Sequence, residues 1–175
     1  MKHLLNRIAD LMAEQSLPGL MIGGHAVTTL GHARATFDLD LLIPRSAAMA
    51  WRSALSAISY RLFAESANFH QYEATQDFPI APLDLMLVDD DVYALMEQTK
   101  QSFQPIPTPS VQAMIALKLH ATKNRSALDA EKDWSDIFAL MRIHQLTLDD
   151  ADFAAIIQRH GGTAAIERIK ATLTE

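Results

Sequence analysis

Residues 20–43 read LMIGGHAVTTLGHARATFDLDLLI, and the rest of the chain is organised around this segment. It opens with a short apolar run that breaks into two glycines, Gly23 and Gly24. It closes with an apolar run that carries two acids, Asp38 and Asp40. Short apolar runs bounded by turn residues are typical of buried strands. We therefore expect strands over residues 20–22 and 37–43, with a short helix between them.

The acid pair is the first functional signal. Side chains two residues apart in a strand point to the same face, so the carboxylates of Asp38 and Asp40 should share one side of the sheet. Such a pair is common on the solvent-exposed face of a strand. Leu39 and residues 41–43 are, however, too apolar for a strand with one fully exposed face. Buried acids repel unless a positive charge lies between them. The pair therefore indicates a site for a hard divalent cation, typically Mg²⁺ shared with a substrate phosphate.

The glycine pair favours a phosphate at the same place. Without side chains, Gly23 and Gly24 let the backbone approach a phosphate closely. The short helix expected over residues 26–30 would aim its N-terminus at the same anion. His25 either donates a hydrogen bond to this phosphate or only marks the entry into the helix.

Composition narrows the classes of protein. The 175 residues suffice for one domain, or for one domain with a helical appendage, and their net charge is −6. This charge gives no overall basic field, so a polynucleotide partner would need a local basic patch. The absence of cysteine excludes disulfides and thiolate metal sites. With no signal-peptide core and no apolar run long enough to span a bilayer, we expect a cytoplasmic protein without a membrane partner.

The remaining pattern predicts an α/β (α+β) fold, in which a small mixed sheet forms a core over residues 1–104 and a C-terminal helical bundle follows over 105–175. In the first part we expect helices over 2–16, from a Ser46 cap to about residue 58, and over 92–99, strands over 60–64, 69–74 and 83–88, and a bend bracketed by Pro79 and Pro82. Prolines at 105, 107 and 109 form a stiff connector. Helices over 111–123 (capped by Ser110), 129–143, 149–160 and 163–173 follow.

Several motifs in order resemble the nucleotidyltransferase superfamily of the polymerase-beta type. These are the glycine pair, the Asp38-x-Asp40 pair, and a third acid, Asp84, on the strand over residues 83–88. The segment with Arg34 and Thr36 just ahead of the acids looks like the small bacterial branch. That branch includes minimal nucleotidyltransferases, antibiotic nucleotidyltransferases and AbiEii-like toxins.

The resemblance implies roles for the residues of the first part. Gly23 and Gly24 would hold the triphosphate through backbone N–H groups, and Asp38 and Asp40 would bind the metal ions. Asp84 would be a third metal ligand or the base for the attacking hydroxyl. The implied cofactor is a pair of Mg²⁺ ions, or Mn²⁺ in their place. The chemistry agrees, since two metals clamp the attacking and leaving oxygens of an in-line displacement.

The resemblance extends into the helical half. Lys118 would reach the nucleotide phosphates, and Asp133 or Asp136 would belong to a distal acid motif. Each residue has a simpler interpretation. Lys118 can extend its ammonium to solvent from an apolar helix, and Asp133 fits a solvated helix surface. Near the acid pair, Arg34 can be a paired loop charge, and Thr36 can orient Asp38 by a hydrogen bond.

The leading functional hypothesis is a metal-dependent nucleotidyltransferase that moves NMP from an NTP, such as ATP, to a hydroxyl acceptor. Within it, a toxin-like enzyme that acts on tRNA or protein, with a cognate antitoxin as partner, comes first. An antibiotic-modifying enzyme comes second, and a catalytically silent nucleotide-binding module is the rival. A tRNA substrate would need a basic groove, for which the candidates are Arg34, Arg45, Arg52, Lys118, Lys123, Asn124 and Arg125.

Overall fold

The computed structural model describes residues 1–75, 81–103, 105–123 and 126–173, which form two compact units. The first, called the core unit here, comprises Met1–Ala26 and Arg34–Pro109. The second, the helical unit, comprises Val27–Ala33 and Ser110–Glu175. These units are defined by compactness and not by independent folding, so the expected division into domains 1–104 and 105–175 stays a prediction.

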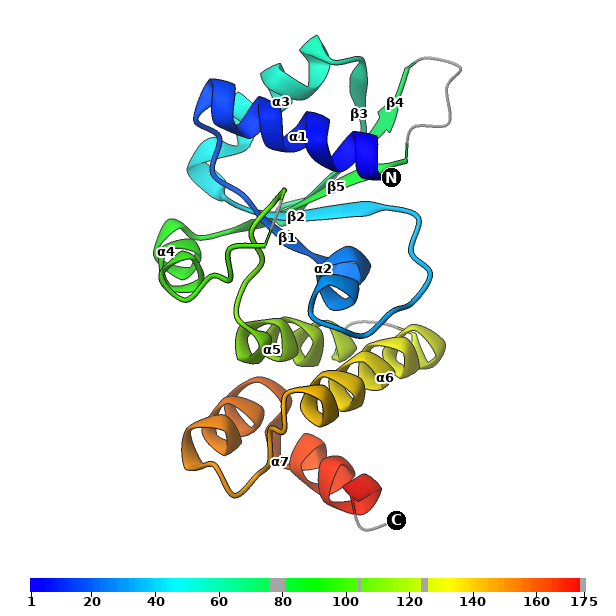
Figure 1. The fold of residues 1–175 in the computed structure, drawn as a ribbon, viewed down its shortest axis with the longest axis vertical. Coiled ribbons are helices and arrows are strands. Elements are labelled where there is room, and N and C mark those ends of the chain that lie inside the picture. Colours follow the sequence, from blue (N-terminus) through cyan, green and yellow to red (C-terminus); the bar gives the residue numbers. More distant parts are fainter. Residues whose placement is uncertain (76–80, 104, 124–125, 174–175) are drawn as a thin grey trace. The chain divides into compact units, whose positions relative to one another are not determined.

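The core unit is built on a five-stranded mixed sheet (Figure 1). Its strands are β1 (Leu20–Ile22), β2 (Leu39–Pro44), β3 (Tyr60–Glu65), β4 (Phe69–Ala74) and β5 (Leu83–Val88). The strand order is β1-β2-β5-β4-β3, in which β2 and β5 are parallel and the other neighbours are antiparallel. The expected mixed sheet is confirmed, and its central strands, β2 and β5, are the two that the acids mark.

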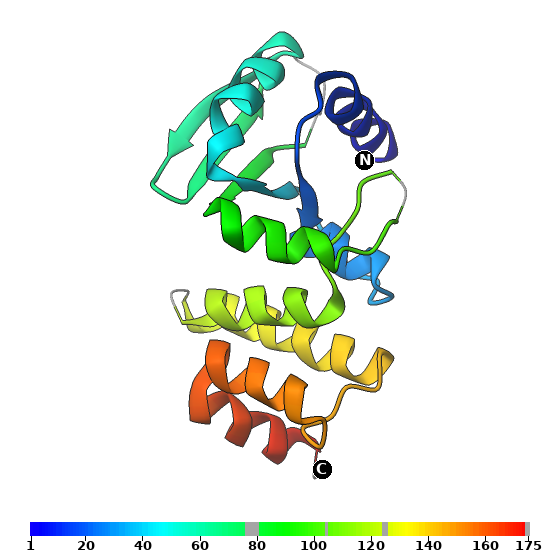
Figure 2. The same cartoon turned by 90° about the vertical axis from the view of Figure 1, so that its left-hand side faces the viewer.

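Helices cover both faces of this sheet. Helices α1 (Lys2–Gln15) and α3 (Ala48–Ala57) lie on one face, and α4 (Asp90–Gln98) lies on the other (Figures 1 and 2). Trp51 on α3 is fully buried, and its indole N–H donates to the carbonyl of Pro18 at 2.9 Å. The buried indole thereby keeps a hydrogen-bond partner while its ring joins the apolar core.

Two elements around the acid pair begin elsewhere than expected. Helix α2 (Gly23–Thr29) starts at the first glycine and not at residue 26, because Gly23 has a φ of +64° and turns the chain straight out of β1. Strand β2 starts at Leu39, whose N–H donates to the carbonyl of Pro82 at 3.0 Å. Its partner β5 begins just after this proline, which has no N–H to donate, so Phe37 precedes the ladder.

The predicted Ser46 cap is wrong. A 3₁₀ turn, η1 (Arg45–Ala47), precedes α3, and no side chain caps the helix. The backbone N–H of Ser46 instead donates to the carboxylate of Asp90 at 3.2 Å, which ties this turn to the start of α4. Pro79, expected in a bend, lies outside the described residues.

The helical unit contains α5 (Val111–Thr122), α6 (Ala127–Ile143) and α7 (Ala151–Leu173). Ser110 caps α5 as expected, since its hydroxyl accepts from the N–H of Ala113 at 3.2 Å. Helix α7 is interrupted at Gly162, whose φ of 74° and ψ of −173° are not helical, so it comprises the two helical segments that the glycines predict. In the described part of the chain, no helix is both long and apolar enough to cross a membrane.

Candidate active site

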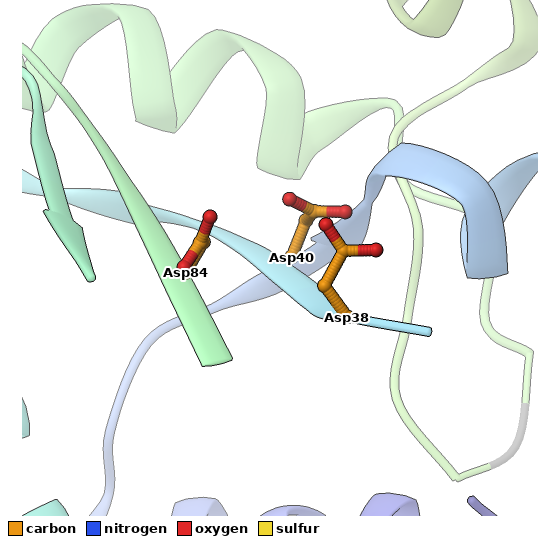
Figure 3. Close-up of side chains that lie close together, drawn as sticks. All are labelled: Asp38, Asp40 and Asp84. Atoms are coloured by element: carbon orange, nitrogen blue, oxygen red, sulfur yellow. The ribbon is translucent and has the colours of Figure 1, made fainter. Parts of the chain in front are cut away.

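Two acids of the candidate site face each other across the central strands. Asp40 on β2 and Asp84 on β5 are direct partners in the parallel register. Partners in a ladder point to the same face, and Figure 3 shows both carboxylates on the same side of the sheet, with Asp38 beside them. Each of the three acids offers one oxygen, and these oxygens all lie within 4.8 Å of one another. The sequence prediction that these three acids come together is met by their positions.

Asp38 reaches the cluster by a different route from the one expected. It lies in a bend just before β2 and not within the strand, because β2 begins at Leu39. Its carboxylate is held by Thr36, whose hydroxyl donates to Asp38 Oδ1 at 3.2 Å. A threonine hydroxyl therefore fixes an orientation that strand geometry does not supply.

Asp84 has a partner that sequence reasoning missed. Gln71 on β4 donates its side-chain N–H to Asp84 Oδ2 at 3.1 Å. Burial raises the pKa of Asp84 above its ordinary value, the Gln71 hydrogen bond lowers this pKa in part, and the charge of Asp38 raises it again. The only sequence signal for this contact is the alternation of side chains along β4. Tyr72 is buried on one face of the sheet, so Gln71 faces the other.

Gly23 and Gly24 lie directly against side chains of the candidate site. A Cβ atom built on Gly23 would lie 2.6 Å from the Cγ of Asp40, and one on Gly24 would lie 2.6 Å from the Cβ of Thr36 and 2.9 Å from Arg34 Nη2. Real Cβ atoms do not approach other atoms so closely, so each glycine is required by a side chain of this protein. Phosphate binding by these glycines stays a prediction.

His25 and Arg34 belong to the same neighbourhood. Burial lowers the pKa of His25 below its ordinary value, the charge of Asp38 opposes this shift, and the charge of Arg34 adds to it. Arg34 also donates to the carbonyl of Ala35 at 3.3 Å. The core unit thus places His25, Arg34 and Thr36 around Asp38, and their roles in nucleotide binding stay predictions.

The three predicted site residues of the helical half form a cluster of their own within the helical unit. The ammonium of Lys118 lies 2.9 Å from Asp133 Oδ1 and 2.6 Å from Asp136 Oδ2. All three residues are buried, and His32 Nε2 lies 3.8 Å from Asp136 Oδ1. The simpler interpretations of Lys118 as solvent-extended and of Asp133 as a helix-surface residue are therefore wrong. Nucleotide binding by this cluster stays a prediction.

The acid triad fits a hard divalent cation. All three candidate ligands are carboxylates, which Mg²⁺ and Mn²⁺ prefer, and they converge from β2, its preceding bend and β5. The hydrogen bonds from Thr36 and Gln71 come from neutral groups, so they orient Asp38 and Asp84 without cancelling their charge. The raised pKa of Asp84 reflects the burial and the crowding of negative charge that a cation would relieve.

Comparison with known proteins gives no match to a protein-family model and none to a curated protein. Solved structures do match. ANT(2″)-Ia, an antibiotic-resistance factor solved with adenylyl-2″-tobramycin, aligns with a TM-score of 0.66 at 20% identity, over 90% of this chain and 97% of its own. The lincosamide antibiotic adenylyltransferase LnuA, solved with lincomycin bound, aligns with a TM-score of 0.60 at 18% identity, over 82% of this chain and 98% of its own.

A third match is a larger protein. The Megavirus polyadenylate synthase aligns with a TM-score of 0.62 at 13% identity, over 83% of this chain but only 32% of the viral one. At these identities the likeness concerns the fold. Small antibiotic-modifying enzymes match over nearly their whole length, whereas the viral enzyme matches over a part. The chain therefore has the fold of these nucleotidyltransferases, as the resemblance of its motifs predicts.

Proposed function

We propose that this protein is a metal-dependent nucleotidyltransferase that moves NMP from an NTP to a hydroxyl group of a small-molecule acceptor. The observation that carries the proposal is the convergence of Asp40 on β2, Asp84 on β5 and Asp38 just before β2, with oxygens within 4.8 Å of one another, on a nucleotidyltransferase fold. An acid triad on this fold favours phosphoryl chemistry over a purely structural role, because crowded carboxylates are costly unless a cation joins them.

In the proposed reaction, Asp38, Asp40 and Asp84 would hold divalent cations, which would neutralise charge on the phosphates. The acceptor oxygen forms a bond to the α-phosphorus as the bond from this phosphorus to the bridging oxygen breaks, and pyrophosphate leaves. The hydroxyl proton passes to Asp84. Its carboxylate belongs to the triad, so it lies where a positioned general base is needed.

The acceptor class rests on two observations. ANT(2″)-Ia and LnuA, which align over nearly their full length, were solved with an adenylylated antibiotic and with a bound antibiotic. The net charge of −6 also suits a cationic acceptor. ANT(2″)-Ia was solved with an adenylylated antibiotic and LnuA is an adenylyltransferase, so ATP is the first donor to test.

The toxin-like alternative, with tRNA or protein as acceptor and an antitoxin as partner, stays a prediction. Two arginines proposed for its basic groove are already engaged. Arg45 pairs with Asp89 at 3.4 Å, and Arg52 pairs with Glu65. Lys118 is buried between two acids, and Asn124 and Arg125 lie outside the described residues. Because these pairs already offset basic charge, we place the toxin-like acceptor second.

The test supplies each α-labelled NTP with Mg²⁺ or Mn²⁺ and three acceptor pools: total RNA, total protein, and a panel of aminoglycosides and lincosamides. We expect cation-dependent pyrophosphate release and a small-molecule product heavier by one NMP, both lost in Asp40→Asn. Label in RNA or protein would move the acceptor to the toxin-like class. Absence of pyrophosphate release with every pool and cation would overturn the proposed function.

A further inference from the structure

Gln71 lies next to the acid triad, and the proposed reaction gives it no role. It lies on β4, directly opposite Asp84 on β5 in the antiparallel register. Asp84 is in turn directly opposite Asp40 on β2. Residues opposite each other point to the same face, so Asp40, Asp84 and Gln71 form a row across three neighbouring strands. Gln71 therefore occupies the end of the row that begins with the acids.

The hydrogen bond between the two side chains has only one chemically sensible direction. A carboxylate accepts hydrogen bonds and donates none, so the amide must turn its NH₂ group toward Asp84 and its carbonyl away. The donor atom lies 3.1 Å from Asp84 Oδ2. This bond holds one of the two carboxylate oxygens and fixes the plane of the group. Asp84 would then present its other oxygen in a defined position to a cation or to the acceptor hydroxyl.

The neutrality of the donor matters for the chemistry. A lysine or arginine in place of Gln71 would fix Asp84 equally well, but it would cancel part of the negative charge that draws cations to the triad. An amide orients the carboxylate and leaves the formal charge of the three acids intact. Thr36 does the same for Asp38 at the other side of the cluster, with its hydroxyl 3.2 Å from Asp38 Oδ1.

Resting on the proposed function, we infer that Gln71 is a positioning residue that holds Asp84 in the orientation needed to bind the divalent cation and to accept the hydroxyl proton. Groups that orient metal ligands in this way typically change metal affinity or activity by about 10–100-fold when they are removed. Gln71 itself touches neither the cation nor the reacting atoms in this assignment. Its loss should therefore lower cation affinity and kcat, and leave the KM for the NTP nearly unchanged.

The informative substitution is Gln71→Met, which keeps the length of the side chain and removes the amide. Gln71→Asn keeps the amide on a shorter stem and should restore part of the loss through a bridging water. The matched control is Glu73→Gln. Glu73 lies two residues along the same strand on the same face, and its carboxylate pairs with Arg61 on β3. The Glu73→Gln substitution removes a charge from β4 and leaves the hydrogen bond between Gln71 and Asp84 in place.

Two measurements separate the outcomes. Mn²⁺ affinity is measured by electron paramagnetic resonance without nucleotide, and kcat and KM are measured with saturating Mn²⁺, after a melting curve has shown that each variant is folded. We expect Gln71→Met to weaken Mn²⁺ binding about 10-fold or more and to lower kcat, Gln71→Asn to lie between, and Glu73→Gln to match the wild type.

Equal Mn²⁺ affinity and equal kcat in Gln71→Met and the wild type would overturn the inference alone. Equal losses in Gln71→Met and Glu73→Gln would also overturn it, because the effect would then belong to the strand and not to the amide. If the wild type binds Mn²⁺ but transfers no NMP, the proposed function fails, while the affinity comparison still decides whether Gln71 positions Asp84. Absence of Mn²⁺ binding in the wild type would overturn both.

Discussion

The two acid clusters of this chain solve the same electrostatic problem in different ways. In the helical unit, Asp133 and Asp136 are buried beside Lys118, at 2.9 Å and 2.6 Å from its ammonium. In the core unit, Asp38 and Asp84 receive hydrogen bonds from the neutral side chains of Thr36 and Gln71. The first cluster contains a cationic side chain of the protein, whereas Thr36 and Gln71 leave the charges of Asp38 and Asp84 intact.

This difference predicts how each cluster responds to substitution. A buried lysine paired with two carboxylates is costly to break, because removing the lysine leaves uncompensated buried charges. Carboxylates oriented by neutral donors keep their charge available to a ligand, at some expense to the fold. We therefore expect opposite responses when the two clusters are altered, and the following experiments are ordered from the largest expected effect to the smallest.

Asp40→Asn removes the central carboxylate of the triad. We expect NMP transfer to fall at least about 10³-fold, because cation binding supports both the attacking and the leaving oxygen. The melting temperature without cation should be unchanged or raised, because one of three repelling charges is gone. Transfer assays and a melting curve in EDTA check both points. Full activity in this variant and in Asp38→Asn would show that the triad is not the active site.

Lys118→Met should mainly lower stability, in contrast to Asp40→Asn. It leaves two buried acids without their ammonium, and breaking such a pair typically costs about 3–5 kcal/mol in the free energy of unfolding. Urea denaturation measures the loss, and the triple variant Lys118→Met, Asp133→Asn, Asp136→Asn should recover most of it. The transfer rate of the folded fraction tests the predicted nucleotide contact of Lys118. If this contact exists, its loss should lower the rate by about 10²-fold. A variant as stable as the wild type would remove the contrast between the clusters.

Gly23→Ala and Gly162→Ala make a matched pair. Both glycines have positive φ, +64° and +74°, so an alanine should cost about 1–3 kcal/mol of stability at either position. A Cβ on Gly162 meets no atom within 4 Å, whereas one on Gly23 would lie 2.6 Å from the Cγ of Asp40. Only Gly23→Ala should therefore also displace Asp40 and lower cation affinity and transfer, by about 10-fold. Equal activity in the two variants would show that Asp40 tolerates displacement.

The pH dependence of stability gives the smallest effect. The pKa of Asp84 is raised in the fold by burial, so ionisation of Asp84 destabilises the protein as pH rises through that pKa. Without cation, Asp84→Asn should melt higher than the wild type at neutral pH, and the difference should vanish at pH values below the ordinary pKa of aspartic acid. Melting curves in EDTA across this range make the comparison.

Asp90→Asn is the control of opposite sign. Hydrogen bonds from Ser46 hold the pKa of Asp90 below its ordinary value, so the charged form of Asp90 stabilises the fold. This contribution is present at neutral pH and is lost as pH falls through the lowered pKa. Asp90→Asn should therefore melt lower than the wild type at neutral pH and no differently in strong acid. The same sign for both variants would show that the shift of Asp84 does not arise from burial.

The sequence by itself determined the elements whose signals are local. The strands over residues 20–22 and 83–88, the hairpin that became β3 and β4, and the Ser110 cap follow from apolar runs, turn residues and capping chemistry within a few positions. The order of glycines and acids also sufficed to predict the nucleotidyltransferase fold. The same local patterns failed where a distant partner sets a boundary, as Pro82 does for the start of β2.

Only the tertiary structure decided how side chains far apart in the chain meet. Gln71 reaches Asp84 because β4 pairs with β5 in one register, and a shift by one residue would turn the amide to the other face. Lys118 is buried because α5 and α6 pack so that acids 15 and 18 positions later surround its ammonium. Register and helix packing depend on the summed contacts of whole elements, and no short stretch of sequence specifies them.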